Sequence, residues 1–348
     1  MFLHRSTIIT TMLSEKSVRS LLRSLGLFSD TEQEIRLLVL HTSVAPAGRV
    51  VYFAFWGREE QPRWVVKSRP CQAFGYNLLA EGQAIDRITE RLAGTSLVQT
   101  LPRVLFAGEY DQSVVLVETY QRGTQYFPGT MTSELESTRR YLRQVAGWLS
   151  AFQAHTRLTG VSSSEIAAHL RQSLDQFAAN YPLLEFERAY LAHMAQDIQE
   201  LSRHIHLCAV HGDFAFNNVR MNGRDLSVVD WEFYSDSGLC AVDPAFWAGA
   251  LICFWLGLPA ADLMEAPHHD AELRAGWTIL QTHFLQPYAA AVGIPTAILE
   301  QAVPFGLVTA AMKQLLAYGF HSTGDEIARL MVRFLARQST LPVERPRR

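Results

Sequence analysis

The feature that most constrains the fold is a change in hydrophobic period about a third of the way along the chain. From residue 34 to residue 118 the apolar residues form short, β-branched runs, which predict strands. After Gln121-Arg122-Gly123 they recur at helical spacing, which predicts amphipathic helices. The chain has 348 residues, which is long for one compact core. We therefore expect two domains, residues 1–118 with a small sheet and residues 119–348 with mainly helices.

Five apolar runs predict the strands of the first domain, and one helix interrupts them. The strands are expected at 35–40, 50–55, 64–67, 104–107 and 114–118, and the helix at 77–92. A further helix is predicted at 14–27, where the leucines repeat along one face. About the first twelve residues are expected to be disordered, and Met12 is an alternative start to Met1.

The second domain is predicted to hold three amphipathic helices and one hairpin. The helices are expected at 133–156, 164–180 and 186–206, with Ser133 as an N-cap. Asn222-Gly223 stands between two strand-like runs, which is a strong hairpin signal. The fold class is thus α+β, a small antiparallel sheet followed by a larger helical part.

Composition excludes several functions. The 31 basic residues stand against 34 acidic ones, a net charge of −3, so no charge excess favours nucleic acid as a partner. The four cysteines form no CxxC pair and no metal-ligand spacing, which argues against a disulfide framework or a zinc site. A reducing, cytoplasmic location is the expectation.

One apolar segment, residues 244–261, has a length near the lower limit for a membrane span. It carries no charge, but Asp243 precedes it, and Pro259 and glycines interrupt it. These features favour a buried core helix, so no membrane span is expected. A membrane-associated protein anchored by this segment is the alternative reading.

A polar constellation surrounds the predicted hairpin. His211-Gly212-Asp213 and Asn218 precede it, and Asp230 ends its second strand. Antiparallel pairing would bring Asp213, Asn218 and Asp230 to the open end of the hairpin. Carboxylate and amide oxygens suit Mg²⁺, especially when phosphate oxygens complete its coordination.

The spacing of these residues is that of a kinase. Asp213 and Asn218 are five apart, as in the catalytic loop H-R-D-x-x-x-x-N. Lys67 ends a predicted strand and Glu81 lies on the next helix, the order of the pair that orients nucleotide phosphates. Glu90, on the same helix, is the alternative partner of Lys67.

At these residues the chain resembles a known family. His211-Gly212-Asp213, Asn218 and Val229-Asp230-Trp231-Glu232 are similar to the signature of aminoglycoside phosphotransferases and choline-kinase-like enzymes, which are small-molecule kinases with the protein-kinase fold. The resemblance covers roughly residues 34–250. The segment 43–48 has one glycine and lacks the G-x-G-x-x-G of protein kinases.

The resemblance implies a two-lobe fold, a reaction and the role of each residue. ATP and Mg²⁺ would be used, and a small-molecule hydroxyl group would be phosphorylated. Asp213 would take the proton of that hydroxyl, and Asn218 and Asp230 would hold Mg²⁺. Lys67, held by Glu81, would neutralise the α- and β-phosphates.

Further roles follow from the same resemblance. Adenine would lie between the lobes, hydrogen-bonded to the backbone around Val117, Glu118, Thr119 and Tyr120. His211 would be a structural hydrogen-bonding residue, and Asp243 would accept hydrogen bonds from backbone N–H groups of the catalytic loop. Glu232 is either a partner of the metal site or a solvated loop residue.

The acceptor is left open by the sequence, and so is the oligomeric state. A sugar or glycan-like hydroxyl is favoured. A polycationic aminoglycoside would need acidic residues, for which the candidates are Asp262, Glu265, Asp270 and Glu272. Choline would need an aromatic box, for which the candidates are Tyr234, Trp247, Phe254 and Trp255. The competing function is a catalytically inactive, kinase-like scaffold that binds nucleotide. The presence of Lys67, Asp213 and Asp230 argues against it.

Overall fold

The computed structural model describes residues 13–28, 35–42, 49–71, 78–125, 135–256 and 270–318, together with 329, 331–333, 335 and 336. Contacts divide the chain into two compact units. The first comprises Met1–Glu90 and Leu101–Arg122, and the second comprises Arg91–Thr100 and Gly123–Arg348. The predicted N-cap Ser133 and the segment 43–48 lie outside the described residues.

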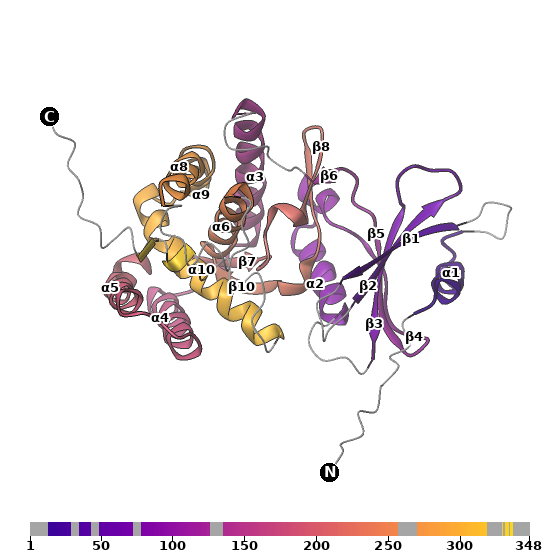
Figure 1. The fold of residues 1–348 in the computed structure, drawn as a ribbon, viewed down its shortest axis with the longest axis horizontal. Coiled ribbons are helices and arrows are strands. Elements are labelled where there is room, and N and C mark those ends of the chain that lie inside the picture. The colour runs from indigo at the N-terminus through magenta and orange to yellow at the C-terminus, as the bar shows by residue number, and fades with distance from the viewer. Residues whose placement is uncertain are drawn as a thin grey trace, which may run out of the picture. The chain divides into compact units, whose positions relative to one another are not determined.

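The first unit is a five-stranded antiparallel sheet with a helix on each face (Figure 1). Its strand order is β1-β2-β3-β5-β4. The elements are α1 (Glu15–Ser24), β1 (Ile35–Thr42), β2 (Arg49–Trp56), β3 (Trp64–Pro70), α2 (Leu78–Arg91), β4 (Val104–Tyr110) and β5 (Ser113–Thr119). All five predicted strands and both predicted helices are present.

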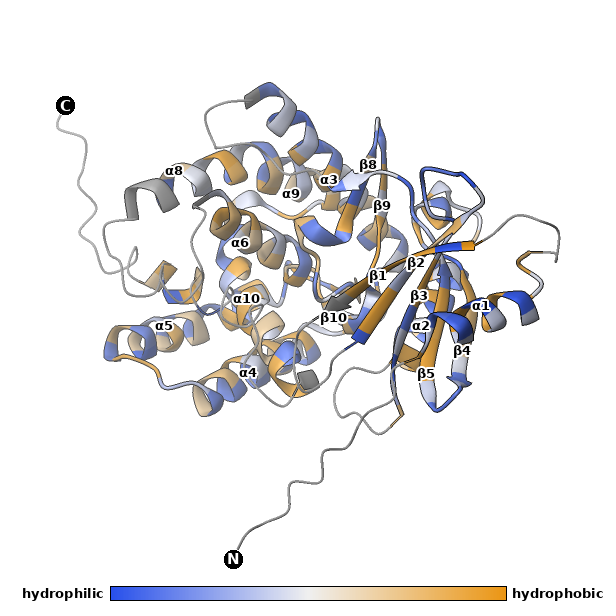
Figure 2. Cartoon of the chain, turned by 45° about the vertical axis from the view of Figure 1, so that its right-hand side comes forward, coloured by the Kyte–Doolittle hydropathy of each residue, from blue (hydrophilic) through white to orange (hydrophobic). Residues whose placement is uncertain are grey.

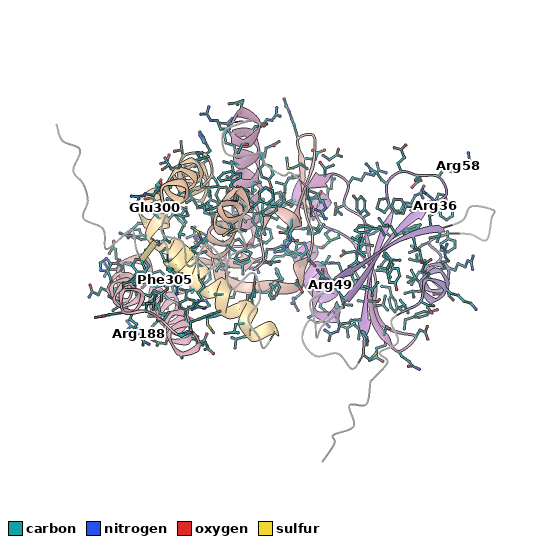
Figure 3. The ribbon with its side chains drawn as sticks, in the orientation of Figure 1. Arg36, Arg49, Arg58, Arg188, Glu300 and Phe305 are labelled. Carbon is teal, nitrogen blue, oxygen red and sulfur yellow. The ribbon has the colours of Figure 1, made fainter. Side chains whose placement is uncertain are left out.

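The alternation of side chains along β3 and β5 decides which residues meet. Val66, Val115 and Val117 are fully buried in the cluster that includes α1. Because successive strand residues point to opposite faces, Lys67 and Glu118 face the side covered by α2. Orange, apolar residues run along β2 and β5 in Figure 2. At the outer edge Arg36 of β1, labelled in Figure 3, donates to the carbonyl oxygens of Gly57 and Glu59.

The second unit is mainly helical and carries two small sheets (Figure 1). Strand β10 pairs with β7 in one sheet, and the other has the order β6-β8-β9. The helices are α3 (Leu135–Thr156), α4 (Ser163–Asn180), α5 (Glu185–Leu201), α6 (Val242–Leu256), α8 (Asp270–Leu280), α9 (Gln286–Val292) and α10 (Thr296–Tyr318), with short helices at Ser96–Thr100, Phe216–Asn218, Trp231–Phe233 and Gln281–Leu285; the strands are β6 (Thr124–Gln125), β7 (Leu207–Val210), β8 (Val219–Asn222), β9 (Asp225–Val228) and β10 (Ser235–Leu239).

Two local predictions need correction. The helix expected at 186–206 ends at Leu201, and it is followed by β7 at Leu207–Val210, a fully buried strand that was not predicted. A short buried strand carries no alternation that would distinguish it from a helix end. The hairpin of β8 and β9 is present, but Asn222 pairs with Asp225, so Gly223 and Arg224 form its turn. The turn is therefore one residue later than predicted.

The apolar segment near residue 244 forms α6, which lies in the core of the helical unit. Every residue from Val242 to Cys253 is buried, and Trp247 is 0% exposed. The predicted buried helix is present up to Leu256, and residues 257–261 lie outside the described part. Phe305 of α10, labelled in Figure 3, is 1% exposed in the same core.

Among the described residues, no one helix has both the length and the apolar character needed to cross a membrane. One sharply bent pair, Arg274–Val292 with Thr296–Leu316, meets the criterion when the two helices are taken together.

Candidate active site

The first unit holds a buried lysine between two carboxylates. Lys67 Nζ lies 2.5 Å from Glu81 Oε1 and 3.2 Å from Glu118 Oε1, and all three side chains are at most 7% exposed. A buried charge is tolerable only when it is paired, and here α2 and β5 each supply a partner. Glu90, the alternative partner, is exposed. The pairing with Glu118 was not expected from the sequence.

Gly82, the residue after Glu81, allows α2 to pack closely against the sheet. A Cβ atom on Gly82 would lie 2.9 Å from Ala107 Cβ and 3.3 Å from a methyl carbon of Leu116. Only glycine fits this approach without a shift of its neighbours. The close packing brings Glu81 within reach of Lys67.

The segment predicted to bind adenine is part of the sheet. Val117 is fully buried opposite Val66. The backbone N–H groups of Thr119 and Tyr120 donate to the carbonyl oxygens of Arg103 and Arg63, at 3.0 and 2.9 Å. A base bound here would use other backbone atoms of the segment, so the adenine contacts stay a prediction.

The second unit holds the loop that follows β7. His211 is 0% exposed, its Nε2 lies 3.0 Å from the carbonyl oxygen of Val229, and its Nδ1 lies 3.3 Å from the backbone nitrogen of Asp213. A backbone N–H must donate to Nδ1, so the ring proton is assigned to Nε2, which donates to Val229. The ring therefore ties the loop to the end of β9, as expected of a structural histidine.

Asp243 fixes the same loop from the first turn of α6. It is 0% exposed, and its two carboxylate oxygens accept the backbone N–H groups of His211 and Gly212, each at 2.8 Å. Burial raises the pKa of this carboxyl to about 6, opposed by the two N–H groups and by Lys313. This is the contact that the family resemblance implied.

Gly212 has the backbone conformation that the loop requires. Its φ is +83°, in the left-handed region, and a Cβ atom would lie 2.3 Å from the carbonyl oxygen of Phe233. Any other residue would be strained and would also clash. Glycine at this position therefore has a steric cause.

The carboxylate of Asp213 is held from both sides. Asn218 Nδ2 donates to its Oδ2 at 3.0 Å and to its backbone oxygen at 2.8 Å. Gln314 Nε2 donates to Oδ1 at 3.0 Å. Gln314 is 2% exposed on α10, and the sequence did not indicate it. A signal did exist, because Lys313-Gln314 is a polar pair after a nearly apolar stretch of that helix.

Asn218 and Asp230 lie at the open end of the hairpin. Asn218 directly precedes β8, and its backbone oxygen accepts the N–H of Val229. Asp230 follows that residue in a left-handed conformation, φ 69° and ψ 62°. Such a conformation in a residue other than glycine is uncommon and is concentrated at functional sites.

These two residues fit a magnesium ion by their chemistry. The amide nitrogen of Asn218 is directed at Asp213, so its side-chain oxygen, which accepts a long hydrogen bond from Asn217 at 3.4 Å, is the atom that could bind a cation, and Asp230 adds a carboxylate. In the described part of the chain, no group of three or more His, Cys, Asp and Glu side chains could hold a metal. An oxygen pair of this kind suits Mg²⁺ when phosphate oxygens complete its coordination.

The acceptor candidates named from the sequence are only partly placed. Trp247 lies in the core, with its ring 4.4 Å from that of Phe284 and 5.9 Å from that of Tyr141, centroid to centroid. Tyr234 donates its hydroxyl proton to Asp236 at 2.5 Å. The side chains of the acidic candidates Asp262, Glu265, Asp270 and Glu272 lie outside the described residues.

Comparison with known proteins identifies the class. The model of the phosphotransferase enzyme family matches residues 48–278, well over half of the chain. The chain therefore belongs to this family, which confirms the resemblance seen in the sequence. A search among curated proteins found no match.

Solved structures agree on the fold. A thermostable mutant of aminoglycoside phosphotransferase APH(4)-Ia, in its apo form, is 15% identical, covers 93% of this chain and 99% of its own, and has a TM-score of 0.51. Macrolide 2'-phosphotransferase type I is also 15% identical, covers 93% and 98%, and has a TM-score of 0.52. The chain has the protein-kinase-like α+β fold of these enzymes. As a member of this family, it is a phosphotransferase.

Proposed function

We propose that the chain transfers the γ-phosphoryl group of ATP to a hydroxyl group of a sugar or glycan-like small molecule. The observation that supports this most is the fixed carboxylate of Asp213, held by Asn218 and Gln314 in a loop that Asp243 anchors. A surface aspartate would need no such support. A catalytic base does, because proton transfer depends on its geometry.

Asp213 orients the acceptor hydroxyl and accepts its proton as the phosphoryl group is transferred. A carboxylate has about four lone-pair sites, and one on each oxygen is taken by an amide N–H. In the proposed reaction these two amide groups hold the carboxylate in the orientation in which it accepts the hydroxyl proton. Catalysis in such enzymes is mostly positioning and charge stabilisation.

The first unit supplies the nucleotide contacts. Lys67, kept charged and directed by Glu81 and Glu118, binds the α- and β-phosphates. Asn218 and Asp230 of the second unit would hold Mg²⁺. That ion, when bound, neutralises charge on the phosphates. We propose residues 1–118 as the nucleotide-binding domain and residues 119–348 as the domain with the catalytic loop and the acceptor site.

A sugar is favoured over choline on packing grounds. Choline recognition needs aromatic faces that are open to the ligand. Trp247, one of the four aromatic candidates, is buried among other rings and offers no such face. A cytoplasmic location is part of the proposal and is supported by four cysteines that are free thiols.

The experiment is an ATP-consumption screen of the purified chain with sugars, aminoglycosides and choline, with and without Mg²⁺. Asp213→Asn should lower turnover by about 10²- to 10⁴-fold, the usual contribution of a general base. Calorimetry should show unchanged ATP binding in this variant, because Asp213 contacts the acceptor and not the nucleotide. Asp225→Asn, which alters an exposed carboxylate of β9, is the matched control.

Two results would contradict the proposal. A loss of ATP affinity equal to the loss of turnover would assign Asp213 to the nucleotide. ATP binding without transfer to any acceptor in the screen would favour the inactive scaffold.

A further inference from the structure

A cavity of about 330 Å³ opens in the helical unit between α4, β10 and α10. This volume is within the range of small-molecule sites. Polar side chains on three elements line it, among them Gln172, Gln176, Ser235, Ser237 and Lys313. No carboxylate is among the described lining residues, so the charge of the cavity wall comes from a lysine.

The ammonium group of this lysine lacks a hydrogen-bond partner among the described residues. Lys313 Nζ is buried and makes no hydrogen bond within the described part of the chain. Asp243 is an opposing charge that acts on Lys313, but both oxygens of Asp243 accept backbone N–H groups. Burial lowers the pKa of Lys313 to about 8, and Asp243 opposes that shift. An unpaired buried ammonium group is costly, which is a reason to expect a ligand for it.

The composition of the chain makes this lysine unusual. Of the 31 basic residues only three are lysines, namely Lys16, Lys67 and Lys313, and the other 28 are arginines. Lys16 is exposed on α1, and Lys67 is the buried lysine already assigned to phosphate. A compact ammonium group differs from a guanidinium group in size and hydration, so the two are not interchangeable at a buried site.

The cavity adjoins the catalytic loop. Lys313 Nζ lies 2.8 Å from the position that a Cβ atom on Gly212 would occupy. The next residue, Gln314, donates to Asp213. A group bound to Lys313 would therefore be held next to the loop that carries the base.

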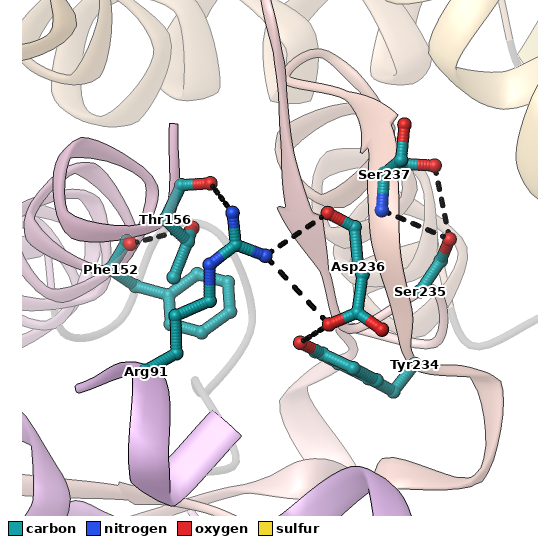
Figure 4. A network of polar contacts seen from close by, with 7 residues as sticks. All are labelled: Arg91, Phe152, Thr156, Tyr234, Ser235, Asp236 and Ser237. Carbon is teal, nitrogen blue, oxygen red and sulfur yellow. Dashed lines mark hydrogen bonds and ion pairs between the residues drawn. The ribbon is translucent and has the colours of Figure 1, made fainter. Parts of the chain in front are cut away.

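The strand wall of the cavity is held in place by hydrogen bonds, as Figure 4 shows. Arg91 donates to the carbonyl oxygens of Asp236 and Thr156, at 3.2 and 2.9 Å. The side chain of Ser235 accepts the N–H of Ser237 and donates to its carbonyl oxygen. A preformed wall lowers the ordering cost of binding a ligand.

We propose that this cavity binds an anionic group of the phosphoryl acceptor, a carboxylate or a phosphate, and that Lys313 is its counter-charge. The inference rests on the proposed function and narrows the acceptor to an acidic hydroxyl compound, such as a sugar acid or a sugar phosphate. A polycationic acceptor would be repelled by Lys313.

Binding of simple anions tests the site without turnover. Inorganic phosphate and D-glucuronate are titrated into the full chain by calorimetry, with D-glucose as the neutral probe. We expect both anions, and not glucose, to bind the unaltered chain, and Lys313→Met to weaken that binding at least about tenfold. Lys16→Met removes the same charge from an exposed site and should leave binding unchanged. No anion binding to the unaltered chain would overturn the proposal even if Lys313→Met does not fold.

Kinetics distinguish an acidic acceptor from a separate anion. In the ATP-consumption assay the unaltered chain should prefer sugar acids or sugar phosphates to the matching neutral sugars, and Lys313→Met should remove the preference through KM. Anion binding that depends on Lys313 without any such preference would assign the cavity to a free anion and overturn the acceptor assignment. Anion binding without any transfer would refute the proposed function instead.

Discussion

Asp243→Ala tests how the catalytic loop is held. Asp243 is fully buried, and its removal leaves the backbone N–H groups of His211 and Gly212 without an acceptor. Each unpaired buried donor costs about 1–3 kcal/mol, so about 4 kcal/mol is expected while the carboxyl is neutral. At neutral pH the cost should be smaller, because the folded protein must then keep a buried charge.

The pKa shift of Asp243 determines how this loss of stability changes with pH, and over which pH range. The pKa of Asp243 is raised from 3.8 to about 6. A raised pKa means that the stabilisation is fully present below about pH 4 and is lost as the pH rises through about 6. Two pH units at about 1.4 kcal/mol each give about 3 kcal/mol. Asp243→Ala should thus lower the free energy of unfolding by only about 1 kcal/mol at pH 7, which is the difference between the two estimates above. At pH 5, where the carboxyl is mostly protonated in the folded protein, the loss should be about 1 kcal/mol larger.

Urea unfolding of both proteins at pH 5, 6 and 7 measures this cost, and kcat measures the effect on the loop. Turnover should fall about 10²-fold, because a displaced loop misplaces Asp213. Asp225→Ala should change the free energy of unfolding by less than about 0.5 kcal/mol at each pH, as an exposed substitution usually does. A cost that grows with pH, or full activity with an unchanged unfolding midpoint, would refute the reasoning.

Three further predictions concern the site. Asp230→Asn should weaken binding of Mg·ATP but not of ATP alone, since it removes a charged oxygen donor; equal calorimetric titrations would contradict the assignment. Glu81→Gln should raise KM for ATP at least about tenfold while the fold is kept, because Lys67 loses a charged partner; an unchanged KM would separate the ion pair from nucleotide binding. Gln314→Leu should lower kcat about tenfold with little change in KM for ATP, because Asp213 loses one of its two side-chain donors; an equal loss in the Asp213→Asn background would show that the effect does not pass through the base.

The sequence predicted what local patterns encode. The five strands of the first unit follow from β-branched runs, and the helix expected at 14–27 is present as α1, Glu15–Ser24. The candidates for catalysis and metal binding in the second unit could be recognised because Asp213, Asn218 and Asp230 are close in sequence. Lys67 and Glu81 were found because a strand and the next helix carry them.

Contacts made by distant segments could not be predicted. The pairing of β7 with β10 joins runs about 30 residues apart, and neither run alternates between apolar and polar residues. Glu118 was expected to act through its backbone, yet its side chain binds Lys67, since the register of β3 and β5 places both on one face. Gln314 lies about 100 residues beyond Asp213, and only the packing of α10 brings the two together.

If both proposals hold, the chemistry and the specificity of this enzyme come from different parts of the chain. The family match ends at residue 278, and it includes every residue that the kinase motif predicts. Lys313 and Gln314 lie beyond it, on α10, yet one is beside Gly212 and the other binds Asp213. Because a base is useful only when the acceptor is placed against it, the element that orients the base is well sited to select the acceptor as well. Variation in α10 would therefore change which hydroxyl compound is phosphorylated, while the loop from His211 to Asn218 keeps the reaction the same.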